Sequence, residues 1–234
     1  MKIFLDGVGI KDLQSFKNNS SISGFTTNPT LLRKDPNLIS YKLYAKEFCD
    51  IILDKPVSFE IISDEPDKII DEALEISSWA DNVNVKIPVV NSQGASNLQT
   101  IKILNDKSVK LNITAVFSEK QIKDVSDIFK DSENENIISI FAGRIADTGL
   151  DPINFIKLGL ECTKNSKAKI LWASPREVLN IYQAKSIECD IITVTTDLYK
   201  KFITLANKDL EEYSKETSKM FYDDAKAVDL NVFE

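Results

Sequence analysis

The sequence predicts an α/β fold, a single eightfold β/α (TIM) barrel with an extra C-terminal helix. The chain has 234 residues, of which 43% are hydrophobic and 28% charged, enough to fill the core of one large domain and keep a polar surface. Short apolar runs alternate with longer amphipathic stretches, which is the organisation of such a barrel. No linker or low-complexity segment interrupts this alternation. We therefore expect one barrel domain over residues 1–234, with residues 197–234 as a helical tail.

The predicted strands are short and rich in Val, Ile, Phe and Thr, as strands buried on both faces are. They cover residues 2–6, 24–28, 57–62, 83–89, 111–117, 137–143, 169–174 and 191–195. Nearly every stretch between them is long enough for a crossover helix. A doubly wound open sheet is the alternative, but the segment Asp6-Gly7-Val8-Gly9 lacks the third glycine of a phosphate-binding loop.

The helices are predicted from periodicity and from capping residues. Apolar residues recur at three- and four-residue steps over residues 66–80, and the same spacing continues over residues 94–104. Ser118 stands three residues before Gln121, which is the pattern of a capping box at a helix start. The tail beyond about residue 196 is highly charged and helical. Its aromatic residues are expected to cap the barrel or to pack on a neighbouring subunit, and the alternative is a solvated terminal helix.

Composition excludes several classes of protein. There are 29 basic and 36 acidic residues, a net charge of −7, which disfavours broad nucleic-acid binding. The absence of histidine removes Ser-His-Asp triads, Cys-His pairs and the usual zinc sites, so a catalyst in this chain must use Lys, carboxylate, hydroxyl or amide groups. We also expect neither a metal nor an organic cofactor. Three separated cysteines indicate reduced thiols. Without a signal peptide or a long apolar run, we expect a cytoplasmic protein that does not span a membrane.

Two further patterns are interpreted as coincidences. The segment Asn112-Ile113-Thr114 matches a glycosylation sequon but lies in an apolar strand. The polar segment over residues 131–136 resembles a calcium loop only loosely, because it lacks the glycine, and we expect a polar turn there.

Polar side chains gather at the C-terminal ends of the predicted strands, where barrels of this kind carry their chemistry. In chain order they are Asp6, Thr26 and Asn28, Glu60, Lys86, Asn112 and Thr114, Phe141 and Arg144, and Ser174 and Arg176. Acids, a lysine, hydroxyls, amides and two arginines are therefore expected to converge on one mouth.

Lys86 is the most informative of these residues, because it stands inside a stretch that otherwise reads as a buried strand. Burying an amine favours its neutral form and frees the lone pair to attack a carbonyl. Asp6 and Glu60 offer the paired carboxylates that such carbonyl chemistry requires. The alternative is a structural lysine in an ion pair with Asp6 or Glu60.

Arg144, Ser174 and Arg176 form a predicted phosphate clamp. They follow the sixth and seventh strands, and phosphate sites of such barrels often use loops late in the barrel. An acidic chain can bind an anionic substrate through a few such basic residues in one cleft. For the arginines, and most of all for Arg176, the alternative is a surface salt bridge.

Several segments resemble those of the transaldolase family, in the short form that also includes fructose-6-phosphate aldolases. The resemblance covers almost the whole chain, and its segments are specific in combination. They are Phe4-Leu5-Asp6, Gly24-Phe25-Thr26-Thr27-Asn28-Pro29-Thr30-Leu31, Val85-Lys86-Ile87-Pro88, Asn112-Ile113-Thr114-Ala115-Val116-Phe117-Ser118, Phe141-Ala142-Gly143-Arg144-Ile145 with Asp147, and Ala173-Ser174-Pro175-Arg176.

The resemblance implies a role for each matching residue. Lys86 matches the lysine that forms a Schiff base, and Asp6 matches the acid that deprotonates the substrate hydroxyl during carbon–carbon cleavage. Glu60 and Thr114 match the pair that positions the water of imine formation and hydrolysis. The remaining matches are substrate-binding: Asn28, Asn112 and Ser139 near the sugar hydroxyls or the imine, and Arg144, Ser174 and Arg176 at the phosphate. Thr26 lies among them.

Two positions separate the subfamilies that the chain resembles. The aldolases usually carry Gln where Glu60 stands and Tyr where Phe141 stands, so this sequence has the pair of a transferase. Pro175 replaces a usual aromatic residue and could shift Arg176. The resemblance implies a homo-oligomer, such as a decamer, that transfers a dihydroxyacetone unit between sugar phosphates. The alternatives are a fructose-6-phosphate aldolase and a sugar-phosphate binding protein without turnover.

Overall fold

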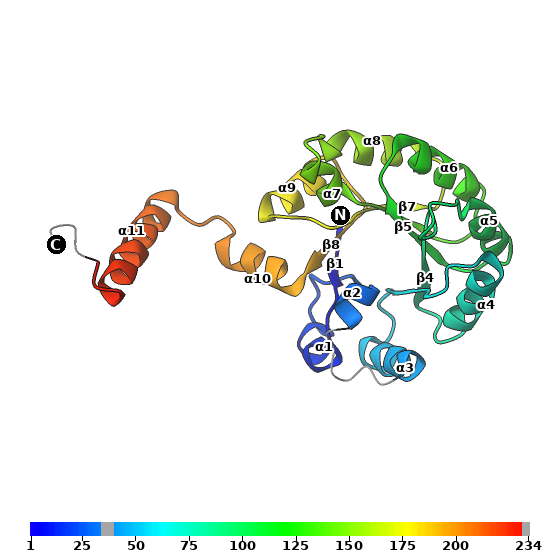
Figure 1. Cartoon of the computed structure of the whole chain (residues 1–234), viewed down its shortest axis with the longest axis horizontal. Helices are drawn as coiled ribbons and strands as arrows, with labels where there is room; N and C mark the ends of the chain where they lie inside the picture. Colours follow the sequence, from blue (N-terminus) through cyan, green and yellow to red (C-terminus); the bar gives the residue numbers. More distant parts are fainter. Residues whose placement is uncertain (34–39, 231–234) are drawn as a thin grey trace. The chain divides into compact units, whose positions relative to one another are not determined.

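The computed structural model describes residues 1–33 and 40–230 and contains a closed eight-stranded barrel (Figure 1). Each strand pairs in parallel with the next one along the chain, and β8 pairs with β1 to close the ring. The strands are β1 (Lys2–Asp6), β2 (Gly24–Thr26), β3 (Val57–Glu60), β4 (Val83–Pro88), β5 (Leu111–Val116), β6 (Ile137–Ile140), β7 (Lys169–Trp172) and β8 (Ile191–Thr195). The predicted fold class is confirmed.

Helices surround the strands on the outside of the ring. They are α1 (Ile10–Phe16), α2 (Pro29–Leu32), α3 (Tyr41–Ile52), α4 (Pro66–Ser77), α5 (Leu98–Asp106), α6 (Glu119–Phe129), α7 (Ala142–Asp147), α8 (Pro152–Thr163) and α9 (Val178–Ser186). The apolar faces of α4 and α6 bury Ile69, Ile76, Ile122 and Phe129. These faces hold the helices against the sheet, because removing apolar surface from water favours burial.

The predicted helix starts are right at one place and wrong at another. Ser118 accepts a hydrogen bond from the backbone of Gln121, and the Gln121 side chain returns one to the Ser118 backbone, so the capping box is confirmed. The helix predicted from residue 94 begins instead at Leu98. Asn91 organises a turn there, since its side chain accepts hydrogen bonds from the backbone N–H groups of Gln93 and Ala95.

Most strands end one to three residues earlier than predicted, although β1 and β8 have the predicted bounds. The largest difference is at β6, which ends at Ile140 because α7 begins at Ala142. Gly143 lies against the backbone of the next loop: a Cβ there would lie 1.6 Å from the carbonyl oxygen of Ser174. The polar residues at the barrel mouth therefore come from strand ends, from the loops directly after them and, for Arg144, from α7.

The tail contains α10 (Thr196–Leu205) and α11 (Leu210–Ala227). The compact units of the chain are Met1–Tyr199 and Lys200–Glu234, and the assignment of the tail to the barrel domain stays a prediction. Residues 231–234 of the predicted tail lie outside the described residues. Within the described part, α11 buries none of its side chains and exposes Met220, Phe221 and Tyr222.

Candidate active site

A cavity of about 490 Å³ opens at the C-terminal ends of the strands. Eleven of the twelve predicted site residues line it, namely Asp6, Thr26, Asn28, Glu60, Lys86, Thr114, Ser139, Phe141, Arg144, Ser174 and Arg176. Because parallel strands all present their C-terminal ends to one face, residues far apart in the sequence meet there. The structure thus brings together the side chains that the sequence pattern grouped.

Lys86 lies on the inner face of β4 and is only 6% exposed. Strand pairing aligns Glu60 of β3 with Lys86, and the Lys86 Nζ atom lies 3.1 Å from Glu60 Oε2. Lys86 Nζ also donates a hydrogen bond of 2.9 Å to the carbonyl oxygen of Thr27. The predicted ion pair is therefore present. It is compatible with a structural lysine and equally with a nucleophile that has a proton acceptor beside it.

Tyr41 holds the end of β3 from which Glu60 projects. Its hydroxyl donates a hydrogen bond of 2.8 Å to the carbonyl oxygen of Glu60. Its ring makes edge-on contacts with Phe59 and Trp79, with ring centroids 6.1 and 5.3 Å apart. Such aromatic contacts add to the burial of the rings and fix the direction of the Tyr41 hydroxyl.

Asp6 accepts hydrogen bonds from two neighbours on the second strand and its loop. Thr26 Oγ1 donates to Asp6 Oδ1 at 2.7 Å, and Asn28 Nδ2 lies 3.4 and 3.3 Å from the two carboxylate oxygens. Burial raises the pKa of the Asp6 carboxyl, while the charge of Lys86 and the hydrogen bonds from Thr26 and Asn28 lower it. The carboxyl has a higher pKa than an exposed aspartate and so is a better proton acceptor.

A second polar layer lies beneath the cavity floor. Asn112 is fully buried, so it supports the floor and does not line the cavity. Its Nδ2 atom donates to Ser58 Oγ at 2.9 Å, and its Oδ1 atom accepts from Ser139 Oγ at 2.7 Å. Strand pairing places Asn112 beside Lys86, so this layer holds up the floor next to the lysine.

Thr114 presents a buried hydroxyl with no hydrogen-bond partner among the described residues. The residue after it, Ala115, has a φ of +54°, and the pairing of β5 with β6 shifts register at this point. Such bulges near barrel rims redirect side chains. A buried hydroxyl left unpaired costs about 1–3 kcal/mol, so the Thr114 hydroxyl is poised to bind a water or a substrate oxygen.

The two predicted phosphate-binding arginines differ in their surroundings. The Arg144 guanidinium lies 5.6 Å from the centroid of the Phe141 ring. Arg176 lines the same cavity, and its guanidinium forms a forked ion pair with Asp147. Arg176 therefore makes the salt bridge that the alternative interpretation expected while it still faces the cavity.

Sequence reasoning missed the residues that β8 contributes. Thr193 and Thr195 line the cavity, and Thr193 Oγ1 lies 2.6 Å from Thr26 Oγ1. Their signal was the alternation in Ile191-Ile192-Thr193-Val194-Thr195, which places both hydroxyls on one face of the strand. Ser58, which supports Asn112, was also missed, although it alternates with Glu60 along β3 in the same way.

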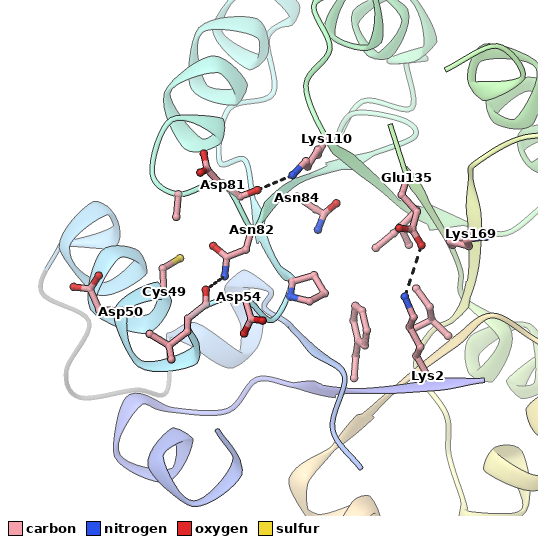
Figure 2. A pocket seen from close by; sticks show the side chains of 16 residues that line it. Lys2, Cys49, Asp50, Asp54, Asp81, Asn82, Asn84, Lys110, Glu135 and Lys169 are labelled. Carbon is pink, nitrogen blue, oxygen red and sulfur yellow. Dashed lines mark hydrogen bonds and ion pairs between the residues drawn. The ribbon is translucent and has the colours of Figure 1, made fainter. Parts of the chain in front are cut away.

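A larger cavity of about 730 Å³ lies at the opposite, N-terminal end of the barrel (Figure 2). None of the predicted site residues lines it. Several polar groups at its rim already have protein partners: Lys2 lies 3.7 Å from Glu135, and Lys110 donates to the carbonyl oxygen of Asp81 at 2.7 Å. Because this cavity lacks the buried lysine and its carboxylates, the candidate site is the cavity at the C-terminal ends.

The described residues contain no group of three or more His, Cys, Asp or Glu side chains that could hold a metal ion. No helix in residues 1–33 or 40–230 is long and apolar enough to cross a membrane.

Comparison with known proteins gives a consistent result. A family model described as transaldolase/fructose-6-phosphate aldolase matches residues 3–232. A Listeria monocytogenes protein named probable transaldolase 2 is 31% identical over 220 residues, covering 92% of this chain and 95% of that protein. A Nitrosopumilus maritimus protein named probable transaldolase is 29% identical over 225 residues, covering 94% and 96%.

Similar solved structures show the barrel fold alone. The orotidine 5'-monophosphate decarboxylase of Metallosphaera sedula has a TM-score of 0.54 at 13% identity and covers 86% of this chain and 91% of that one. A mandelate oxidase mutant has a TM-score of 0.58 at 7% identity and covers 82% and 64%.

Proposed function

The chain belongs to the transaldolase/fructose-6-phosphate aldolase family, and from this premise we propose that it is a transaldolase. It transfers a dihydroxyacetone unit from a ketose phosphate (fructose 6-phosphate or sedoheptulose 7-phosphate) to an aldose phosphate (erythrose 4-phosphate or glyceraldehyde 3-phosphate). The observation that carries the proposal is the buried Lys86 amine, 3.1 Å from Glu60, in one cavity with Asp6 and two arginines.

The first steps form an imine. Glu60 takes a proton from the Lys86 ammonium, and the amine nitrogen attacks the C2 carbonyl of the ketose to give a carbinolamine. Loss of the C2 oxygen as water gives the imine. Glu60 and the Thr114 hydroxyl, which has no hydrogen-bond partner among the described residues, hold that water and later return it for hydrolysis, which regenerates the free lysine.

Asp6 then breaks and remakes the carbon–carbon bond. Its carboxylate takes the proton of the C4 hydroxyl, the C3–C4 bond breaks, and its electrons move into the imine to give an enamine on Lys86. The aldose phosphate leaves, and an acceptor aldehyde reacts with the enamine by the reverse steps. Asn28, through the amide nitrogen that contacts Asp6, and Ser139, on the cavity floor, are placed to bind sugar hydroxyls.

The phosphate lies at the rim in this proposal. Arg144, Ser174 and Arg176 bind it, and the Asp147 carboxylate orients the Arg176 guanidinium. Two positive charges in one cleft attract a phosphorylated sugar although the chain as a whole has a net charge of −7.

Glu60 and Phe141 favour transfer over simple cleavage. A phenylalanine brings no hydroxyl that would hold a water against the enamine. The dihydroxyacetone enamine therefore persists until an aldehyde arrives. The second candidate is a fructose-6-phosphate aldolase, and the third is a sugar-phosphate binding protein.

The deciding experiment measures release of glyceraldehyde 3-phosphate from fructose 6-phosphate, with and without erythrose 4-phosphate. Release that requires the acceptor supports a transaldolase, release without it supports an aldolase, and no release supports the binding protein. Borohydride trapping of substrate should be lost in Lys86→Ala and kept in Lys157→Ala, an exposed lysine on α8. Trapping that survived Lys86→Ala would place the imine on another lysine.

The assembly and the location are also proposals. The exposed Met220, Phe221 and Tyr222 of α11 support a homo-oligomer in which this helix packs on a neighbouring subunit. Light scattering of the purified chain tests it, and a monomer at all concentrations would contradict it. The cytoplasmic location, the absence of nucleic-acid partners and the absence of a cofactor stay predictions.

A further inference from the structure

A buried chain of hydroxyl groups ends on the Asp6 carboxylate. Thr193 on β8 and Thr26 on β2 lie on the two strands that flank β1, and their hydroxyl oxygens are 2.6 Å apart. Thr26 Oγ1 is in turn 2.7 Å from Asp6 Oδ1. Thr26 is 2% exposed and Thr193 is 6% exposed, so water has little access to these contacts.

The number of available protons fixes the direction of the hydrogen bonds in this series. A hydroxyl has one proton to donate, and an ionised carboxylate can only accept. Thr26 gives its proton to Asp6, and its contact with Thr193 must therefore be one in which Thr193 donates. The Thr26 hydroxyl thus accepts one hydrogen bond from Thr193 and donates one to Asp6. Hydrogen bonds in such a series also polarise one another, which strengthens the last one.

We propose that Thr193 is a positioning residue for the Asp6 carboxylate and that it acts through the Thr26 hydroxyl. The inference rests on the proposed function, in which Asp6 takes the proton of the substrate hydroxyl. Thr26 supplies the shortest contact to the carboxylate, because the Asn28 nitrogen is 3.3 and 3.4 Å away. The orientation of Asp6 therefore depends mainly on the direction in which the Thr26 hydroxyl points.

The surroundings of Asp6 determine the sign of the pH effect. Burial raises the pKa of this carboxyl, and the Lys86 charge with the hydrogen bonds from Thr26 and Asn28 opposes burial. Removing the Thr193 hydroxyl weakens one of these opposing contacts, so the pKa of Asp6 rises further. A base with a higher pKa is protonated at higher pH, and the acid limb of the rate profile moves up. The other charged groups lining the cavity are Glu60 from β3, Arg144 from α7 and Arg176 from the loop after β7.

The test compares Thr193→Val with Thr193→Ser. Two quantities are measured for each protein: the pH dependence of kcat and KM for fructose 6-phosphate, and the pKa of Asp6 from the ¹³C carboxyl resonance, identified through Asp6→Asn. Losing the net contribution of one hydrogen bond corresponds to a rise of about half to one unit in the pKa of Asp6 in the valine variant. We expect KM to stay constant and kcat above the acid limb to approach the wild-type value. The serine variant, which keeps the hydroxyl, should restore the wild-type profile.

A buried threonine outside the site provides the control. The Thr163 hydroxyl bonds to the carbonyl oxygen of Gly159 within α8, so Thr163→Val should lose stability without a shift of the acid limb. An unchanged Asp6 titration in Thr193→Val, or the same pH-independent loss of kcat in the valine and serine variants, would overturn the proposal. If the valine variant fails to fold, Thr193→Cys, which keeps a weaker donor, should give a smaller shift, and no shift there would also overturn it.

The two proposals fail in different ways. Absence of both glyceraldehyde 3-phosphate release and borohydride trapping in the wild-type protein would refute the proposed function. The carboxyl titration needs no turnover, so it reports on Thr193 in either case.

Discussion

The buried ion pair between Lys86 and Glu60 makes a measurable prediction about stability. The two side chains are only 8% and 15% exposed, and their charged atoms are 3.1 Å apart. Glu60→Leu removes the carboxylate. The Lys86 ammonium keeps its hydrogen bond to the carbonyl oxygen of Thr27 at 2.9 Å and the charge of Asp6, but it loses the acidic side chain that lies against it. Breaking a buried pair in this way costs about 3–5 kcal/mol. For a domain of this size, each kcal/mol lowers Tm by about 2–4 °C, so Tm should fall by about 6–20 °C.

Removing both charges should reverse the loss. Lys86→Met/Glu60→Leu replaces both members of the pair by apolar side chains of similar size, which is often neutral or stabilising. Asp6 then loses the Lys86 charge, so the pKa of its carboxyl rises further and the group is more readily protonated. The free energy of unfolding should then return to the wild-type value or exceed it. Denaturant unfolding at one protein concentration measures all three proteins, and equal m-values show that the same surface is exposed in each.

The exposed pair of Lys120 and Asp124 on α6 is the control, because Lys120 is 82% exposed and Lys120→Met should cost less than about 0.5 kcal/mol. Two results would refute the reasoning. One is a loss below about 1 kcal/mol in Glu60→Leu, and the other is a double variant as unstable as the single one.

Three further predictions concern single substitutions. Arg144→Ala should raise KM for fructose 6-phosphate at least about tenfold and leave KM for fructose unchanged. Arg176→Ala should raise KM for fructose 6-phosphate less, because Asp147 already holds that guanidinium. Equal losses for both ketoses would contradict a phosphate clamp. Phe141→Tyr should raise release of glyceraldehyde 3-phosphate without acceptor relative to release with it, and an unchanged ratio would remove Phe141 from the choice between transfer and cleavage. Ser118→Ala should lower stability by about 1 kcal/mol through loss of the capping box, seen as a lower Tm with unchanged kcat; an unchanged Tm would show that the cap contributes nothing.

Charged residues in buried strands made much of the site predictable. A lysine between Val85 and Ile87 in an apolar run has no packing reason to be there, because burying its charge is costly. The strand order then follows from the alternation of apolar runs and helices, so the C-terminal ends could be grouped without knowing any distance. This is why ten residues grouped by the strand-end pattern line one cavity, together with Ser139, which the family resemblance added.

Backbone geometry at the rim was less predictable, because it depends on contacts between distant segments. Gly143 allows the carbonyl group of Ser174 to approach its backbone, and Ser174 itself has a φ of +60°. Glycine is the residue that tolerates such an approach, but the sequence does not show which neighbour requires it. The runs at β6 and β7 were consequently extended too far, since apolar residues continue after the backbone has left the sheet.

The hydroxyl residues Thr193, Thr195 and Ser58 were missed for a different reason. Threonine is favoured in strands whether or not its hydroxyl has a function, so Thr193 within β8 gives no signal by its residue type. Only its partner distinguishes it: the Thr193 hydroxyl meets Thr26, and through Thr26 it reaches the charged Asp6. The costly buried charges of such a barrel can therefore be found from the sequence, whereas the neutral groups that orient them require the positions of both partners. A functional search of a barrel sequence should accordingly start from the buried charges and then test every inward-facing hydroxyl on the flanking strands.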